Sequence, residues 1–141
     1  MDPHVEIVSK REQDVEQLFG LAKTAFAGNP RWSDRRVLDA LREDVVFVAR
    51  EHGRPAGYVA IRQGPDRTMV VEQLFVAPGH EHHGIGHRLL AHAEGYAIAG
   101  HADTLFIEVE EDNVAARSFY RRSGFVPVDR ELFELVLPRL G

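Results

Sequence analysis

Seven separate stretches of the chain either alternate apolar and polar residues or form short apolar runs between turn residues. A spacing of two places successive side chains on opposite faces of an extended strand, so these stretches are typical of β-strands. Glycine, proline and aspartate between them favour turns. The pattern therefore predicts strands at Val5–Val8, Val45–Arg50, Pro55–Arg62, Thr68–Val76, Thr104–Val109, Phe125–Val128 and Leu132–Leu137.

Other stretches repeat their apolar residues every three or four positions, which is the spacing of one face of an α-helix. The first runs from Asp14 to Phe26 and is broken by a Gly-Asn-Pro sequence. Ser33 is placed to cap a second helix. A third stretch runs from Gly86 to about Ala99, and a fourth runs from Asn113 to Arg122 and is stopped by a glycine. The pattern therefore predicts four helices.

The predicted order is β-α-α-β-β-β-α-β-α-β-β. It joins a meander of three strands to strands that are connected through helices, which indicates a mixed sheet in an α/β layer fold. The chain has 141 residues, the size of one domain, and we expect a single domain over residues 1–141.

Composition narrows the range of functions. The chain contains no cysteine, which excludes disulfides, thiolate metal sites and a cysteine nucleophile. Its formal net charge of −5 argues against a general nucleic-acid binder, which needs a basic face. The first ten residues lack the pattern of a secretory signal, and no apolar run approaches the roughly 18 residues of a spanning helix. We therefore expect a cytoplasmic protein that binds neither nucleic acid nor a membrane.

The stretch from His80 to Leu90, HEHHGIGHRLL, combines four histidines with a Gly-Ile-Gly sequence at the start of a predicted helix. The first turn of a helix has N–H groups without intrahelical partners and carries the positive end of the helix dipole. Glycines let a ligand approach that backbone closely, so this arrangement favours a phosphate-binding loop. Taken alone, it is equally well explained as a glycine-rich turn that begins a helix.

The histidines raise the alternative of a metal site. His83 and His87 are spaced i and i+4, with His80 and His82 nearby. Zinc takes about four ligands, usually from separate elements, and the chain offers no cysteine and no second cluster of ligating residues downstream. We therefore predict no metal site, although a His-rich metal-binding module remains a rival class.

A second motif, NVAARSFYRRSGF, runs from Asn113 to Phe125. Asn113, Ala116 and Tyr120 are spaced i, i+3 and i+7 and therefore share one face of a helix. Alone, the motif describes only a short amphipathic helix that ends at Gly124. Its order and distance from the glycine loop make the pair of motifs more specific than either one.

Together the two motifs and LFVAP (Leu74–Pro78) resemble the GNAT superfamily of acetyl-CoA-dependent N-acetyltransferases. The matching residues are GIGHRLL (Gly84–Leu90) and N-x-x-A-x-x-F-Y-x-x-x-G-F (Asn113–Phe125), and the order of elements agrees over nearly the whole chain. The resemblance implies one GNAT-like domain over residues 1–141, with a mixed central sheet of about seven strands and about four helices. It also implies acetyl-CoA as co-substrate.

The resemblance assigns the contacts with the cofactor. The strand backbone would hydrogen-bond the pantetheine arm, and the loop amides would hold the pyrophosphate. Asn113 would contact the cofactor near the pantetheine or its thioester end. The cofactor-binding residues implied in this way are Leu74, Phe75, Val76, His82, His83, Gly84, Ile85, Gly86, His87, Asn113, Ala116 and Phe119.

The resemblance also assigns catalytic groups. Tyr120 lies where the family places the acid that protonates the departing CoA thiolate. A strand N–H near Val76 suits the oxygen of the tetrahedral intermediate, and a base must first neutralise the attacking amine. We prefer Glu72 as that base because it shares strand parity with Val76, and Glu108 is the alternative. Either glutamate is equally well explained as a solvated or salt-bridged sheet residue.

Two positions depart from the family. Glu81 stands where an arginine or glutamine is usual, and His82 where a glycine is common. A carboxylate repels pyrophosphate unless it points to solvent, and protonated histidines would offset it, so we expect cofactor affinity to rise as pH falls from 8 to 6. This departure supports the alternative of a catalytically silent acyl-CoA-binding regulatory module.

The acceptor is expected to be a small-molecule or peptide amine. In folds of this family the first two helices and their loop line the acceptor site, which here implies residues 26–33. A homodimer is possible, but the sequence does not decide the oligomeric state.

Overall fold

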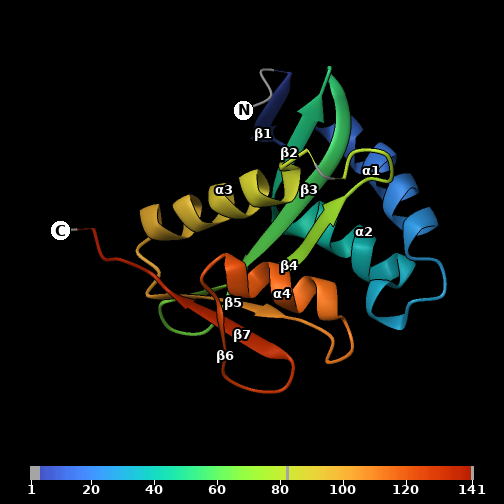
Figure 1. Cartoon of the computed structure of the whole chain (residues 1–141). Coiled ribbons are helices and arrows are strands. Elements are labelled where there is room, and N and C mark those ends of the chain that lie inside the picture. The colour runs from blue at the N-terminus through green and yellow to red at the C-terminus, as the bar shows by residue number, and fades with distance from the viewer. Residues whose placement is uncertain (1–3, 82, 141) are drawn as a thin grey trace. The chain divides into compact units, whose positions relative to one another are not determined.

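The computed structural model describes residues 4–81 and 83–140. In this part of the chain four α-helices and a short 3₁₀ helix accompany seven strands (Figure 1). Their bounds are β1 (Val5–Ser9), α1 (Glu12–Ala25), η1 (Pro30–Trp32), α2 (Asp34–Glu43), β2 (Val45–Glu51), β3 (Arg54–Gln63), β4 (Thr68–Val76), α3 (Ile85–Ala99), β5 (Thr104–Glu108), α4 (Val114–Arg122), β6 (Val126–Pro127) and β7 (Leu132–Val136).

The strands follow the order β1-β2-β3-β4-β5-β7-β6 in one sheet. β4 and β5 pair in parallel, whereas β1–β2, β2–β3, β5–β7 and β6–β7 are antiparallel. This confirms the predicted α/β fold with a mixed sheet of seven strands and four helices. Among the described residues, none of the helices is both long and apolar enough to cross a bilayer.

The sixth strand and the segment before α2 differ most from the prediction. The sixth strand, expected over Phe125–Val128, comprises only Val126 and Pro127, which pair with Glu134 and Phe133. Proline has no N–H to donate to a neighbouring strand and is therefore favoured on edge strands, and β6 stands at the end of the strand order. The short helix η1 was not predicted; Asn29 caps it by accepting the N–H of Arg31 at 3.0 Å.

Contacts divide the chain into two compact units, and strand β4 contributes to both. The first comprises Met1–Ile61 and Gln73–Ala93, and the second comprises Arg62–Glu72 and Glu94–Gly141. The single domain over residues 1–141 stays a prediction.

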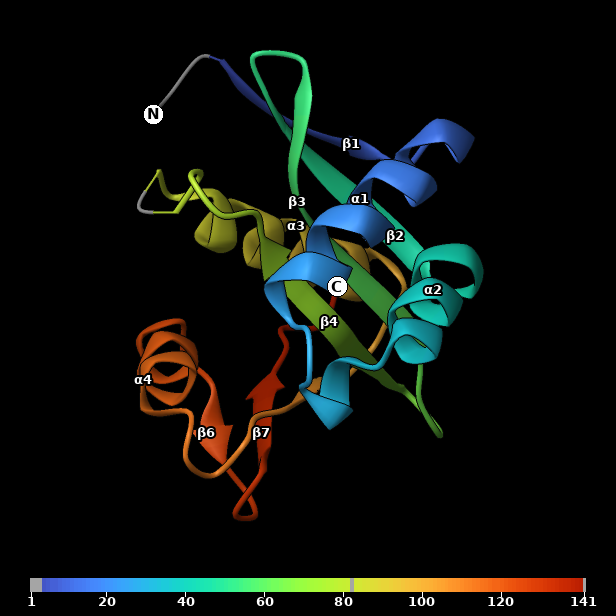
Figure 2. The ribbon, with the colours of Figure 1, turned by 90° about the vertical axis from the view of Figure 1, so that its right-hand side faces the viewer.

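In the first unit, α1 and α2 cover one face of the strands and the beginning of α3 lies on the other (Figures 1 and 2). The core between the strands and the first two helices is apolar because each element buries one face. Its fully buried members include Leu18, Val37, Leu41, Val48 and Tyr58. At the margin of this core Asp14 and Arg50 form a buried ion pair between α1 and β2.

In the second unit, β5 pairs on one side with Thr68–Val71 of β4 and on the other with β7. Its core gathers Leu105, Ile107, Phe125 and Phe133, all buried. α4 ends at Arg122 with Ser123 as its C-cap, and Gly124 follows with φ of +97°, a left-handed conformation that favours glycine after a helix.

Candidate active site

The second half of β4 presents two faces. Phe75 is buried and packs against Tyr58, Phe26 and Trp32, with ring centroids 5.6, 5.6 and 6.5 Å away. Leu74 and Val76, predicted to contact the cofactor through their backbone, are half-buried and have the opposite parity.

Two backbone features surround these residues. The parallel register of β4 with β5 ends at Val71 opposite Ile107, so residues 74–76 lie beyond it. On the β3 side the backbone approaches closely, since a Cβ built on Gly57 would lie 2.4 Å from the carbonyl oxygen of Phe75. Glycine at position 57 is therefore a steric requirement of this strand pair.

The loop between β4 and α3 turns at two glycines with positive φ, Gly79 at +89° and Gly84 at +75°. The N–H of His80 donates to the carbonyl of Ala77 at 3.0 Å, and that of Arg88 donates to Gly84 at 3.1 Å. α3 then begins at Ile85, which is 1% exposed and anchors the helix in the core. The predicted loop residues Gly84, Ile85, Gly86 and His87 therefore form the turn and the first turn of α3.

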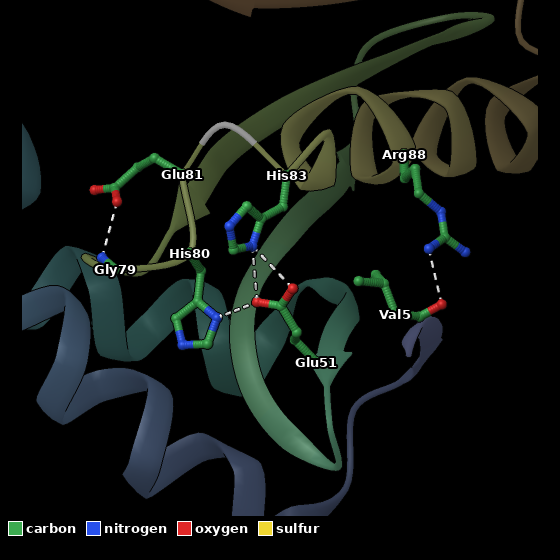
Figure 3. A network of polar contacts seen from close by, with 7 residues as sticks. All are labelled: Val5, Glu51, Gly79, His80, Glu81, His83 and Arg88. Atoms are coloured by element: carbon green, nitrogen blue, oxygen red, sulfur yellow. Dashed lines mark hydrogen bonds and ion pairs between the residues drawn. The ribbon is translucent and has the colours of Figure 1, made fainter. Parts of the chain in front are cut away.

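The unusual Glu81 is oriented by the loop itself. Its carboxylate accepts the N–H of Gly79 at 2.8 Å and points away from Glu51 (Figure 3). The predicted contact of His82 lies outside the described residues.

The histidines reach a partner that the sequence pattern did not indicate. Nδ1 of His80 lies 2.6 Å from Oε1 of Glu51, and Nδ1 of His83 lies 3.1 and 2.9 Å from its Oε1 and Oε2 (Figure 3). Glu51 ends β2 and is only 6% exposed. The hydrogen bond from His80 is the main cause that lowers the pKa of Glu51; burial opposes it, and His83 adds to it.

Within residues 4–81 and 83–140, no group of three or more histidine, aspartate or glutamate side chains is arranged to hold a metal ion. The predicted rise of cofactor affinity at lower pH stays a prediction. The charges that bear on this prediction now include the carboxylate of Glu51, which faces the rings of His80 and His83.

The second unit contains the Asn113–Phe125 motif. The side-chain oxygen of Asn113 accepts the N–H of Ala116 at 3.1 Å and so caps α4, with the backbone of Asn113 outside the helix. Tyr120 is 7% exposed and lies between Phe119 and Phe125, at centroid distances of 5.2 and 5.8 Å. Burial raises the pKa of Tyr120 well above its usual value, so the phenol stays protonated through the neutral range.

The two candidate bases also lie in the second unit. Oε2 of Glu72 lies 2.9 Å from Nε of Arg62, and the Glu72 side chain is 17% exposed. The salt bridge that the sequence allowed for Glu72 is therefore present, and its role as the base stays a prediction. Glu108 ends β5 in an exposed position, opposite Leu132 of β7.

One further polar residue of β4 was not predicted. Gln73 is 3% exposed, and its Oε1 accepts the hydroxyl of Tyr58 at 2.7 Å. Its Nε2 is buried with no hydrogen-bond partner among the described residues. The signal available in the sequence was strand parity, because Gln73 occupies the same face as buried Phe75.

Comparison with known proteins adds to this geometry. Residues 13–125 match the model of the acetyltransferase (GNAT) family. The chain is 38% identical over 74 residues to streptothricin acetyltransferase of Streptomyces lavendulae, covering 52% of this chain and 39% of that protein. It is 32% identical over 127 residues to the N-alpha-acetyltransferase RimI of Mycobacterium tuberculosis, covering 86% and 78%.

Among solved structures, PaiA N-acetyltransferase of Thermoplasma acidophilum in complex with coenzyme A has a TM-score of 0.77 at 20% identity. That match covers 96% of this chain and 99% of the other, and it shows the shared fold. The matched segments span between 39% and 59% of the length of three of the curated relatives. With most of its length matched by the family model, the chain belongs to the acetyltransferase (GNAT) family.

Proposed function

We propose that the chain transfers an acetyl group from acetyl-CoA to a primary amine by direct attack of the amine on the thioester. The observation that carries this proposal is the loop after β4, where left-handed Gly84 leads directly into the first turn of α3. Such a turn presents backbone N–H groups to a phosphate. The relative from Thermoplasma acidophilum that shares this fold is a coenzyme A complex.

For the cofactor, we propose that residues 74–76 hydrogen-bond the pantetheine arm through their backbone. Their place beyond the β4–β5 register supports this role. The pyrophosphate would lie on the amides of residues 82–87. Asn113 would contact the cofactor near the pantetheine or its thioester end while retaining its capping role, and Ala116 and Phe119 would also contact the cofactor.

For the chemistry, we propose Tyr120 as the acid that protonates the CoA thiolate. A tyrosine phenol carries its proton at neutral pH, as this role requires. Burial raises the pKa of Tyr120 above its usual value, which makes the phenol a weaker acid until the thiolate forms beside it. Glu72 remains our first candidate for the base and Glu108 the second. The exposed position of Glu108 supports access to water, whereas Glu72 would have to release Arg62.

The acceptor is proposed to be the amine of a small molecule or of a peptide. The names of the relatives cover both classes, streptothricin in one and an α-amino group in the other. A cytoplasmic location and a homodimer stay predictions.

Two measurements test the proposal. Acetyl-CoA at about a hundred times its dissociation constant should stabilise the chain by about 2.7 kcal/mol, a shift of several degrees in thermal unfolding. Thiol release from acetyl-CoA, followed with a panel of amines, should then depend on Tyr120, and Tyr120→Phe should lower kcat about 100-fold. Binding without thiol release for any amine would favour the silent acyl-CoA-binding module, and no thermal shift would contradict both functions.

A further inference from the structure

Glu51 is a carboxylate at the edge of the first unit that has been taken almost entirely out of solvent. It is the last residue of β2, opposite Val5 of β1 and Arg54 of β3, and is 6% exposed. A buried charge is retained only where partners offset its lost hydration. The partners of Glu51 are two histidines that lie 29 and 32 residues further along the chain.

Both partners belong to the short loop that leads into α3. A carboxylate only accepts hydrogen bonds, so Nδ1 of each ring must carry the proton that it donates. His83 uses both carboxylate oxygens, and His80 shares Oε1 with it. The loop is therefore attached to the end of β2 at two points, and the second point directly precedes Gly84.

The helix that follows is attached to the same region. The guanidinium of Arg88 donates to the carbonyl of Val5 at 2.8 Å, and Val5 is the β1 residue opposite Glu51 (Figure 3). Both sides of Gly84 thus have fixed partners on β1 and β2. The attachments use side-chain nitrogens, so backbone N–H groups of the loop do not take part in them.

We propose that Glu51 is a positioning residue for the phosphate-binding loop, which it holds through His80 and His83 in the conformation that receives the cofactor pyrophosphate. This inference rests on the proposed function. If the loop also samples conformations that cannot bind the pyrophosphate, only a fraction of the molecules is competent to bind CoA. The apparent dissociation constant for CoA then rises in inverse proportion to that fraction. Glu51 would therefore act on cofactor affinity without touching the cofactor.

The first variant is Glu51→Gln, which keeps the shape of the side chain but removes its charge and one acceptor oxygen. We expect the dissociation constant for CoA, measured by isothermal titration calorimetry, to rise about tenfold as the competent fraction falls to about one-tenth. Glu16→Gln, at an exposed position of α1, makes the same change of charge and should leave the constant unchanged.

Two further readouts separate positioning from a general structural role. Glu51→Gln should accelerate hydrogen exchange in the peptide that carries His80 and His83, without cofactor present. In a double-mutant cycle it should add little to CoA affinity when His80→Gln and His83→Gln are already present, because residues that act through one another are not additive. Those histidine variants change exposed or half-buried loop side chains, so they also serve if Glu51→Gln fails to fold.

The outcomes are distinct. Wild-type chain that binds no CoA would overturn the proposed function and, with it, the positioning role. Wild-type chain that binds CoA, with equal affinity in Glu51→Gln or in the double histidine variant, would overturn the positioning role alone. Additive losses in the cycle would also overturn it, since Glu51 would then act by another route.

Discussion

The two units hold their candidate site residues by different means. In the first, the loop histidines depend on Glu51, which lies 29 to 32 residues away in sequence. In the second, Asn113 binds an N–H three residues further on, and Tyr120 packs against its neighbours Phe119 and Phe125. A site held by local contacts is visible in a motif, whereas a site held by distant contacts needs the fold to bring its partners together.

The largest effect should come from the long-range pair of Asp14 and Arg50 in the first unit. Arg50→Met leaves the buried carboxylate of Asp14 without its cation, and we expect a loss of about 3–5 kcal/mol of unfolding free energy. Urea unfolding measures it. The matched control is Arg35→Met, which removes an exposed i,i+4 pair with Asp39 and should cost about 0–1 kcal/mol. Equal losses of unfolding free energy in Arg50→Met and Arg35→Met would mean that the buried, long-range ion pair is no more important for stability than the exposed, local one.

A smaller effect is expected where the support is local. Asn113→Ala removes the cap of α4, and we expect a loss of about 1 kcal/mol in the same unfolding experiment. Asn113→Asp keeps a side-chain oxygen in the capping position and should retain most of that stability. A loss in Asn113→Asp as large as that in Asn113→Ala would show that the cap is not what Asn113 contributes.

The smallest effect concerns acid stability through Glu51. Its pKa is lowered from an ordinary 4.5, so the folded chain holds this carboxyl ionised where the unfolded chain has begun to protonate it. The stabilisation is complete above pH 4.5 and is lost as pH falls through the lower folded value. The unfolding free energy of wild type should therefore fall more steeply below pH 4.5 than that of Glu51→Gln. Parallel pH profiles would contradict the pairing with His80 and His83.

Most of the fold could be predicted because periodicity in a strand or helix is a local property. The β2–β3–β4 meander and α4 follow directly from alternating residues and from the i, i+3, i+7 face of Asn113 and Tyr120. The β6 strand is shorter than predicted, with Val126 and Pro127 paired to Glu134 and Phe133, and Pro127 has no N–H to donate to β7. Glu51 was missed because it lies just past the predicted strand Val45–Arg50, and Gln73 because it resembles any other strand residue. Their partners, His80 and Tyr58, are brought beside them only by the fold.

Gly57 and Gly84 show that two glycines can be required for unrelated reasons. At position 57 a Cβ would lie 2.4 Å from the carbonyl oxygen of Phe75, so even alanine would force the backbone of this strand pair to shift. At position 84 a Cβ meets no atom within 4 Å in the part of the chain that the structure describes, but φ of +75° disfavours other residues. Asparagine and aspartate tolerate that conformation best. A library that varies this chain should therefore leave position 57 fixed and sample position 84 with asparagine first, because aspartate would add a negative charge to the proposed pyrophosphate loop.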